Sequence, residues 1–104
     1  MVLPPLTKIS QEFPRLGLPD VARSAIDTLA DSNLRLNIRP GMRVGITAGS
    51  RGIRNIDIIL REVALYVKFL GGLPLLLAAM GSHGGAEPAG QKKLLHSLGI
   101  TEAA

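Results

Sequence analysis

Hydrophobic residues follow a helical spacing in three stretches of the chain and form short continuous runs in two others. Apolar positions repeat every three or four residues over 20–36, 56–70 and 88–98, which predicts three helices with one apolar face each. The runs at 43–48 and 75–80 predict β-strands. The second run has no charged residue and does not alternate with polar ones. That pattern is typical of a strand buried on both faces of a parallel sheet.

The order strand, helix, strand, helix predicts an α/β fold, a parallel βαβα Rossmann-like unit with a helix in front of it. Two strands make a poor independent sheet, so we expect a partial domain over residues 20–104. Residues 1–19 contain four prolines, which predicts an extended, proline-rich arm. The apolar residues of this arm need a surface to cover, either on the domain or on a partner.

Composition restricts the function. The chain has 104 residues, enough for one small domain, and a formal net charge of +4. Its basic residues are scattered and only 3% of residues are aromatic, which argues against nucleic acid and suits a small anionic ligand. The absence of cysteine excludes disulfides and thiolate metal sites. We find neither a signal-peptide pattern nor a membrane span, so we expect a cytoplasmic protein, with a homo-oligomer as one possibility.

Two glycine-rich loops, 49–55 and 81–85, each follow a predicted strand. The carboxyl ends of parallel strands meet at one edge of a sheet, where open α/β sheets bind ligands. Glycines let backbone N–H groups turn toward an anion without hindrance from a Cβ atom. Ser50 and Ser82 add hydroxyl donors. The first loop is not a Walker loop, because no Gly-Lys-Ser/Thr follows. It is not the dinucleotide fingerprint either, because its glycines lack that spacing and no acidic residue stands at the end of a second strand.

Each loop carries one side chain of chemical interest. Arg51 suits a carboxylate or phosphate, although a loop arginine more often caps a helix or pairs with a surface acid. His83 could act as a general base or acid. A lone loop histidine is more often structural, but the three glycines around this one favour a catalytic role. His96 lies thirteen residues further on, and nothing in that spacing brings the two imidazoles together, so we predict no metal site.

A longer pattern links these residues to a known family. It consists of Gly49-Ser50-Arg51-Gly52-Ile53, a helix, then Ala79-Met80-Gly81-Ser82-His83-Gly84-Gly85-Ala86 and Gly90-Gln91. This pattern resembles the N-terminal domain of the nickel-pincer-nucleotide-dependent lactate racemase family. The likeness is greatest to a branch whose members are mostly of unassigned substrate. The likeness also includes the proline-containing start of the chain, so it covers nearly the whole sequence.

The resemblance implies a racemase or epimerase of small 2-hydroxy acids that uses a nickel-pincer nucleotide and hydride transfer. His83 matches a catalytic histidine that takes the hydroxyl proton. Arg51 matches an arginine that holds the substrate carboxylate or nearby anionic groups. The resemblance gives a further set of residues to substrate and cofactor binding: Ser50, Gly52, Gly81, Ser82 and Gly84.

The chain also departs from the family pattern. Lactate-specific members have an Asp-His-Thr-Arg type loop where Gly49-Ser50 precede Arg51 here, which argues against lactate itself. The chain ends before the family's cofactor-linked lysine, nickel-ligating histidine and second catalytic histidine would occur. We therefore expect a truncated N-terminal part that is inactive alone and needs the rest of the racemase, as a C-terminal part or a second chain. Two alternatives remain open: a non-catalytic anion- or nucleotide-binding α/β module, and a structural fragment that pairs with a second chain.

Overall fold

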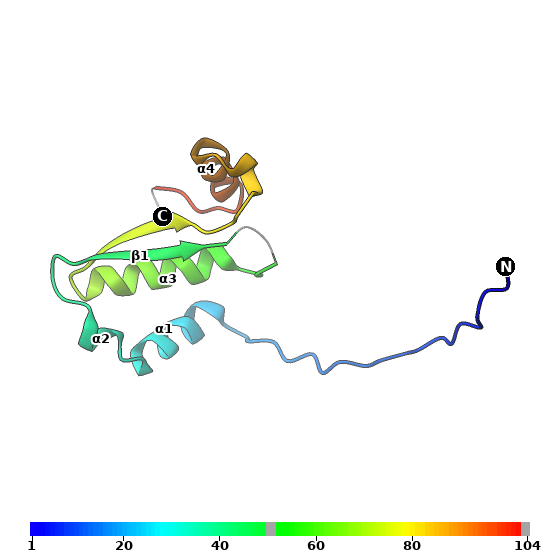
Figure 1. Ribbon diagram of the computed structural model, residues 1–104. Coiled ribbons are helices and arrows are strands. Elements are labelled where there is room, and N and C mark those ends of the chain that lie inside the picture. Colours follow the sequence, from blue (N-terminus) through cyan, green and yellow to red (C-terminus); the bar gives the residue numbers. More distant parts are fainter. Residues whose placement is uncertain (50–51, 103–104) are drawn as a thin grey trace.

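The sheet at the centre of the fold has two parallel strands (Figure 1). The computed structural model describes residues 1–49 and 52–102. Strand β1 spans Arg43–Ala48 and strand β2 spans Leu73–Ala78, paired in register from the first residue to the last. The predicted α/β class and the parallel pairing are both confirmed.

Helix α3, Ile56–Phe69, connects the two strands and covers one face of the sheet. Alternate residues of β1 point toward it: Val44 is half-buried, and Ile46 and Ala48 are buried. Since side chains alternate across a strand, the residues between them face the opposite side and are exposed. One buried cluster forms the core around these positions: Ile38, Ile46, Ala48, Leu60, Val67, Met80, Leu95 and Ile100.

The predicted helix over 20–36 is two helices, α1 at Val21–Asp31 and α2 at Leu34–Asn37. Helix α1 starts at Asp20, whose carboxylate accepts a hydrogen bond of 2.9 Å from the Arg23 N–H, and it packs against α3. The break falls at Ser32, which has an extended backbone and donates its hydroxyl to the Leu29 carbonyl. A serine that satisfies a helix carbonyl in this way competes with the next helical turn.

Helix α4, Pro88–Ser97, follows a short 3₁₀ turn, η1, at His83–Ala86. Pro88 stands in the first turn of α4, where its missing N–H costs no helical hydrogen bond. The helix terminates before Gly99, which has a φ of +82°, and the Ile100 N–H donates to the Leu95 carbonyl at 3.0 Å.

Strand β2 differs from its prediction in position and in burial. It begins at Leu73 rather than Leu75, and it is not buried on both faces. Leu73, Leu75 and Leu77 are 55%, 45% and 50% exposed on the face away from α3. The physical reason is that no second layer covers this face in the part of the chain that the structure describes. A continuous apolar run reports a tendency to be buried, and burial itself requires a neighbouring element.

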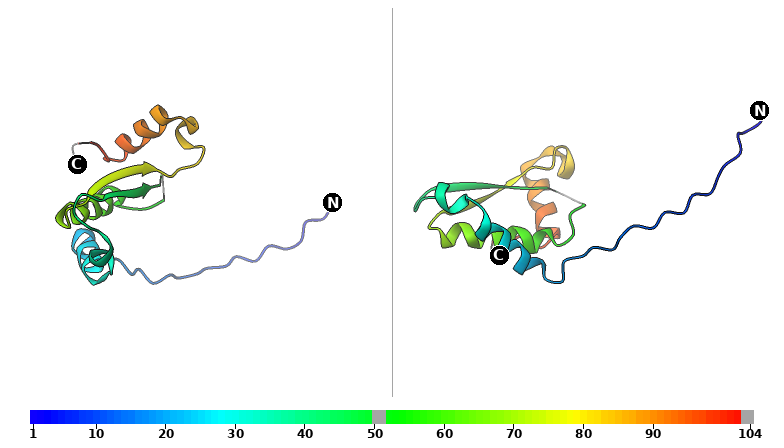
Figure 2. Two further views of the ribbon diagram at one scale, coloured as in Figure 1. Left: turned by 60° about the vertical axis from the view of Figure 1, so that its left-hand side comes forward. Right: turned by 90° about the horizontal axis from the view of Figure 1, so that it is seen from below.

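The arm, residues 1–19, contains neither helix nor strand and runs away from the domain, as Figure 2 shows from two further sides. Every residue in it is exposed, so the arm does not pack on the domain. The radius of gyration is consequently 19.1 Å, against about 13 Å for a compact domain of this length. None of the described helices has the length and apolar character needed to cross a membrane.

Removing residues 1–17 should leave the free energy of unfolding unchanged within about 0.5 kcal/mol, because the arm makes no packing contact with the domain. Urea denaturation followed by circular dichroism measures this. Asp20→Ala is the positive control, since losing this N-cap should cost about 1 kcal/mol. A loss of more than about 1 kcal/mol on removing the arm would mean that the arm packs on the domain in solution.

Candidate functional site

The two glycine-rich loops leave the sheet side by side. Ala48 and Ala78 are register partners at the ends of their strands, and the Ala79 N–H donates to the Ala48 carbonyl at 2.8 Å. Ser50 and Arg51, both predicted to bind substrate or cofactor, lie outside the described residues. Gly52 is described; it is exposed and has a φ of +90°, which L side chains rarely adopt.

Left-handed backbone dominates the second loop. Gly81, Gly84 and Gly85 have φ values of +57°, +66° and +73°, and Ala86 has +55°. The His83 N–H donates to the Met80 carbonyl at 3.1 Å, so the chain turns directly after the strand. Met80 is buried in the core. Ser82 and His83 are exposed.

This histidine loop, residues 81–86, is held from outside by the start of α4. Gly84 packs so closely on the helix that a Cβ on it would lie 2.6 Å from the Gln91 backbone nitrogen. A Cβ on Gly90 would overlap the Gly84 carbonyl oxygen. In addition, the Gln91 side chain donates through Nε2 to the Gly81 carbonyl at 3.0 Å. The two glycines therefore allow a backbone-to-backbone contact that larger residues would prevent.

Sequence reasoning missed the roles of Gly90 and Gln91, which entered only as the end of a motif. A signal was present, because a glycine inside a helical pattern costs about 1 kcal/mol relative to alanine and so usually has a packing reason. The sequence did not reveal which backbone approaches Gly90. That depends on the path of the histidine loop, which the structure supplies.

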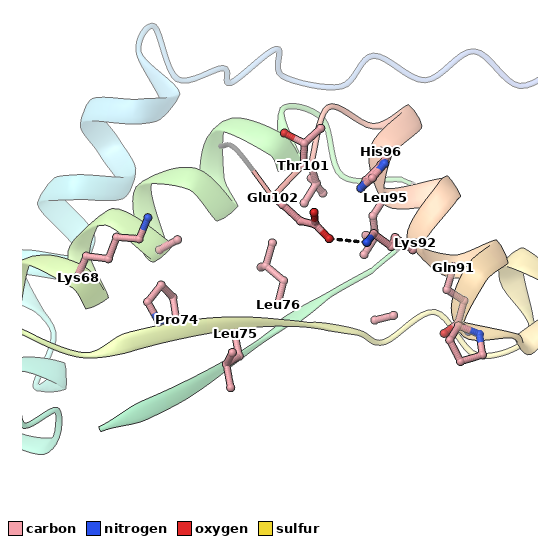
Figure 3. Close-up of a pocket in the computed structure, with 14 residues that line it drawn as sticks. Lys68, Pro74, Leu75, Leu76, Gln91, Lys92, Leu95, His96, Thr101 and Glu102 are labelled. Carbon is pink, nitrogen blue, oxygen red and sulfur yellow. Dashed lines mark hydrogen bonds and ion pairs between the residues drawn. The ribbon is translucent and has the colours of Figure 1, made fainter. Parts of the chain in front are cut away.

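A cavity of about 530 Å³ lies next to this loop, between α3, β2, α4 and the segment after α4 (Figure 3). Leu76 points into it, whereas Leu75 points away on the other side of the strand. Gln91 lies at one end, and none of the predicted site residues that the structure describes lines it. This cavity is therefore not the place of the predicted proton transfer.

Two residues that line the cavity, Lys92 and Glu102, form an ion pair. The Lys92 ammonium donates to the Glu102 carboxylate, an interaction drawn as a dashed line in Figure 3. This hydrogen bond, together with the positive charge of Lys92, lowers the pKa of the Glu102 carboxyl below its ordinary value. Both side chains are largely exposed, so water screens the pair and its contribution to stability is small.

The predicted residues of the second loop, Gly81, Ser82, His83 and Gly84, lie together at the carboxyl edge of the sheet. His96 is elsewhere, on the last turn of α4 and against the cavity. Among residues 1–49 and 52–102, no three His, Asp or Glu side chains are grouped closely enough to hold a metal ion. The arrangement can therefore offer a proton-transfer group and backbone donors, but no metal-binding cluster within the described chain.

Comparison with known proteins adds no relative: no family model, no curated protein and no solved structure matches this chain.

Gly90→Ala should destabilise the domain by about 1–3 kcal/mol, because the added methyl group collides with the Gly84 carbonyl. The sign is diagnostic, since the same change inside an ordinary helix stabilises by about 0.5–1 kcal/mol. Chemical denaturation measures the difference. Ala89→Gly, at the neighbouring and exposed position, is the matched control and should destabilise only by helix propensity. Stabilisation by Gly90→Ala would contradict the close contact.

Lys92→Met should raise the pKa of the Glu102 carboxyl toward its ordinary value, because both the hydrogen bond and the nearby positive charge are lost. The carboxyl pKa is depressed in the folded state, so the pair stabilises the fold above the unfolded pKa and loses this effect as pH falls through the folded pKa. Carboxyl-detected NMR titration measures the midpoint. An identical midpoint in Lys92→Met and the parent chain would show that the pair does not form in solution.

Proposed function

We propose that this chain is the N-terminal part of a racemase or epimerase of small 2-hydroxy acids, with its two strands belonging to a larger Rossmann-like sheet. The observation that supports the proposal is the pairing of Ala48 with Ala78 at the strand ends. This pairing starts both glycine-rich loops at one edge, where α/β enzymes bind ligands. The sequence resemblance supplies the reaction class.

His83 is the proton-transfer residue in this proposal. Racemisation of a 2-hydroxy acid through its keto form requires a base that removes the hydroxyl proton and an acid that returns it. Histidine is the usual residue for both tasks at neutral pH. Exposure of His83 and the glycines on both sides of it are consistent with a substrate approaching its imidazole. His83 thus exchanges one proton with the substrate hydroxyl and returns to its starting state in each turnover.

The remaining predicted residues bind and orient the substrate. Arg51 holds the carboxylate, with Ser50 and Ser82 as hydroxyl donors. The glycines Gly52, Gly81 and Gly84 let backbone approach the ligand closely. A carboxylate anchored on the first loop would put the hydroxyl-bearing carbon near the second loop, since the two loops begin on adjacent strands. The expected ligand is therefore a short, anionic 2-hydroxy acid.

The nickel-pincer nucleotide implied by the resemblance would supply hydride transfer. The described residues do not fit this group, because the resemblance puts its attachment lysine and its nickel-ligating histidine outside this chain and the described residues contain no cluster of metal-ligating side chains. We therefore derive no step through it and assign only proton transfer and anion binding to this chain. In the proposal, the rest of the racemase carries the cofactor as a further segment or a second chain, and the assembled enzyme is cytoplasmic.

The test is His83→Ala in the complete, cofactor-loaded protein. Loss of a general base should lower kcat roughly 10²–10⁴-fold on enantiopure 2-hydroxy acids. Polarimetry measures the rate of racemisation. His96→Ala is the matched control and should leave the rate unchanged, because His96 lies in the last turn of α4, whereas the first turns of that helix contact the histidine loop.

Full activity of the His83→Ala protein would rule out the catalytic assignment. A parent protein that binds phosphate or a mononucleotide in calorimetry but racemises none of the acids would instead favour the anion-binding module. The two outcomes are distinguished because the second requires binding without turnover.

A further inference from the structure

The side chain of Gln91 connects α4 to the start of the histidine loop, ten residues earlier in the chain. It lies in the first turns of α4, and its Nε2 donates to the Gly81 carbonyl at 3.0 Å. Gly81 immediately follows the buried Met80 and stands two residues before His83. The hydrogen bond therefore fixes the peptide at which the histidine loop leaves the strand.

The histidine loop needs a contact from outside the loop to hold its conformation. Glycine populates both signs of φ with similar ease, so Gly81, Gly84 and Gly85 do not by themselves select one backbone path. The contact of Gly84 with Gly90 locates the far end of the loop against α4. Gln91 holds the near end, and His83 stands between these two points.

We propose that Gln91 is a positioning residue for His83, acting through the backbone from Gly81 to His83. Its catalytic meaning rests on the proposed function, whereas its effect on the loop does not. Gln91 lies one residue after Gly90, so a single turn of α4 supplies both contacts. A rigid helix sets the loop more reproducibly than contacts within the loop would.

The proposal depends on the donor character of the Gln91 amide. A carbonyl oxygen only accepts hydrogen bonds, so its partner must present an N–H or O–H. Methionine has nearly the same length but no donor. A carboxyl group donates only when protonated, so Gln91→Glu should restore the bond at low pH and lose it when ionised. This pH-dependent restoration tests whether residue 91 acts on the loop as a hydrogen-bond donor rather than by filling space.

The experiment follows the amide signals of Gly81, His83, Gly84 and Gly85 by NMR in the full chain. In Gln91→Met these signals should shift or broaden, while the His96 imidazole signal stays in place. In Gln91→Glu the loop signals should match the parent chain at low pH and move away from it through a titration step. That step should lie above the usual glutamate pKa of about 4.3, because only the protonated carboxyl can donate to the Gly81 carbonyl. Lys93→Met, an exposed position on the same helix, is the matched control and should change none of these signals.

Other ionisable side chains lie near this hydrogen bond: His83 in the loop, Glu87 at the start of α4, and Lys92, His96 and Glu102 around the cavity. Any effect of these groups on the loop signals also occurs in the parent chain. Comparing the titration of Gln91→Glu with that of the parent chain therefore removes it. Loop signals that are unchanged in Gln91→Met, or a Gln91→Glu chain without the extra step, would overturn the proposal.

In the complete enzyme, Gln91→Met should lower kcat roughly 10–100-fold with little change in KM, since misplacement of a reacting group by about 1 Å has effects of this size. A shifted loop together with unchanged kcat would overturn the catalytic part of the proposal alone. Failure of the proposed function is recognised separately, because it appears as full activity in His83→Ala.

Discussion

Parallel pairing of β1 with β2 is the constraint on which the other parts of the site depend. Parallel strands cannot be joined by a tight turn, so the chain must cross over, and α3 is that crossover. The crossover brings both strands to the same edge, where Ala48 and Ala78 end them together. An antiparallel pair would send the two glycine-rich loops to opposite ends of the sheet. The neighbourhood of the loops therefore follows from strand direction, before any side chain is considered.

The exposed face of β2 shows how far this small sheet depends on additional cover. Leu73, Leu75 and Leu77 expose about half of their surface there, and Phe69 at the end of α3 is 83% exposed. A row of exposed leucines along one face of a strand is a surface that a further layer would cover. In the described residues the buried core lies on the α3 side of the sheet. This is consistent with a unit that belongs to a larger sheet.

Local signals made much of the fold predictable. Pro88 marks the start of α4 and Gly99 marks its end. Each signal comes from one residue: proline lacks the N–H that a first helical turn does not need, and glycine tolerates the positive φ that ends a helix. Burial of β2 was predicted wrongly, since it depends on layers that a run of leucines cannot specify. The break between α1 and α2 depends on a single hydrogen bond, from the Ser32 hydroxyl to the Leu29 carbonyl. For the candidate site, the sequence located the histidine loop but not its contacts with α4, because those join residues whose spacing follows no local period.

The conformation of the histidine loop has to come from its surroundings. A loop rich in glycine loses much conformational entropy on folding, and a left-handed alanine such as Ala86 adds a steric cost. Contacts outside the loop must offset both terms: the Met80 carbonyl at its start, and the backbone of Gly90 and the amide of Gln91 on α4. The glycines make the path possible, and the helix selects it. The orientation of His83 is therefore determined by the helix that follows the loop as much as by the strand that precedes it.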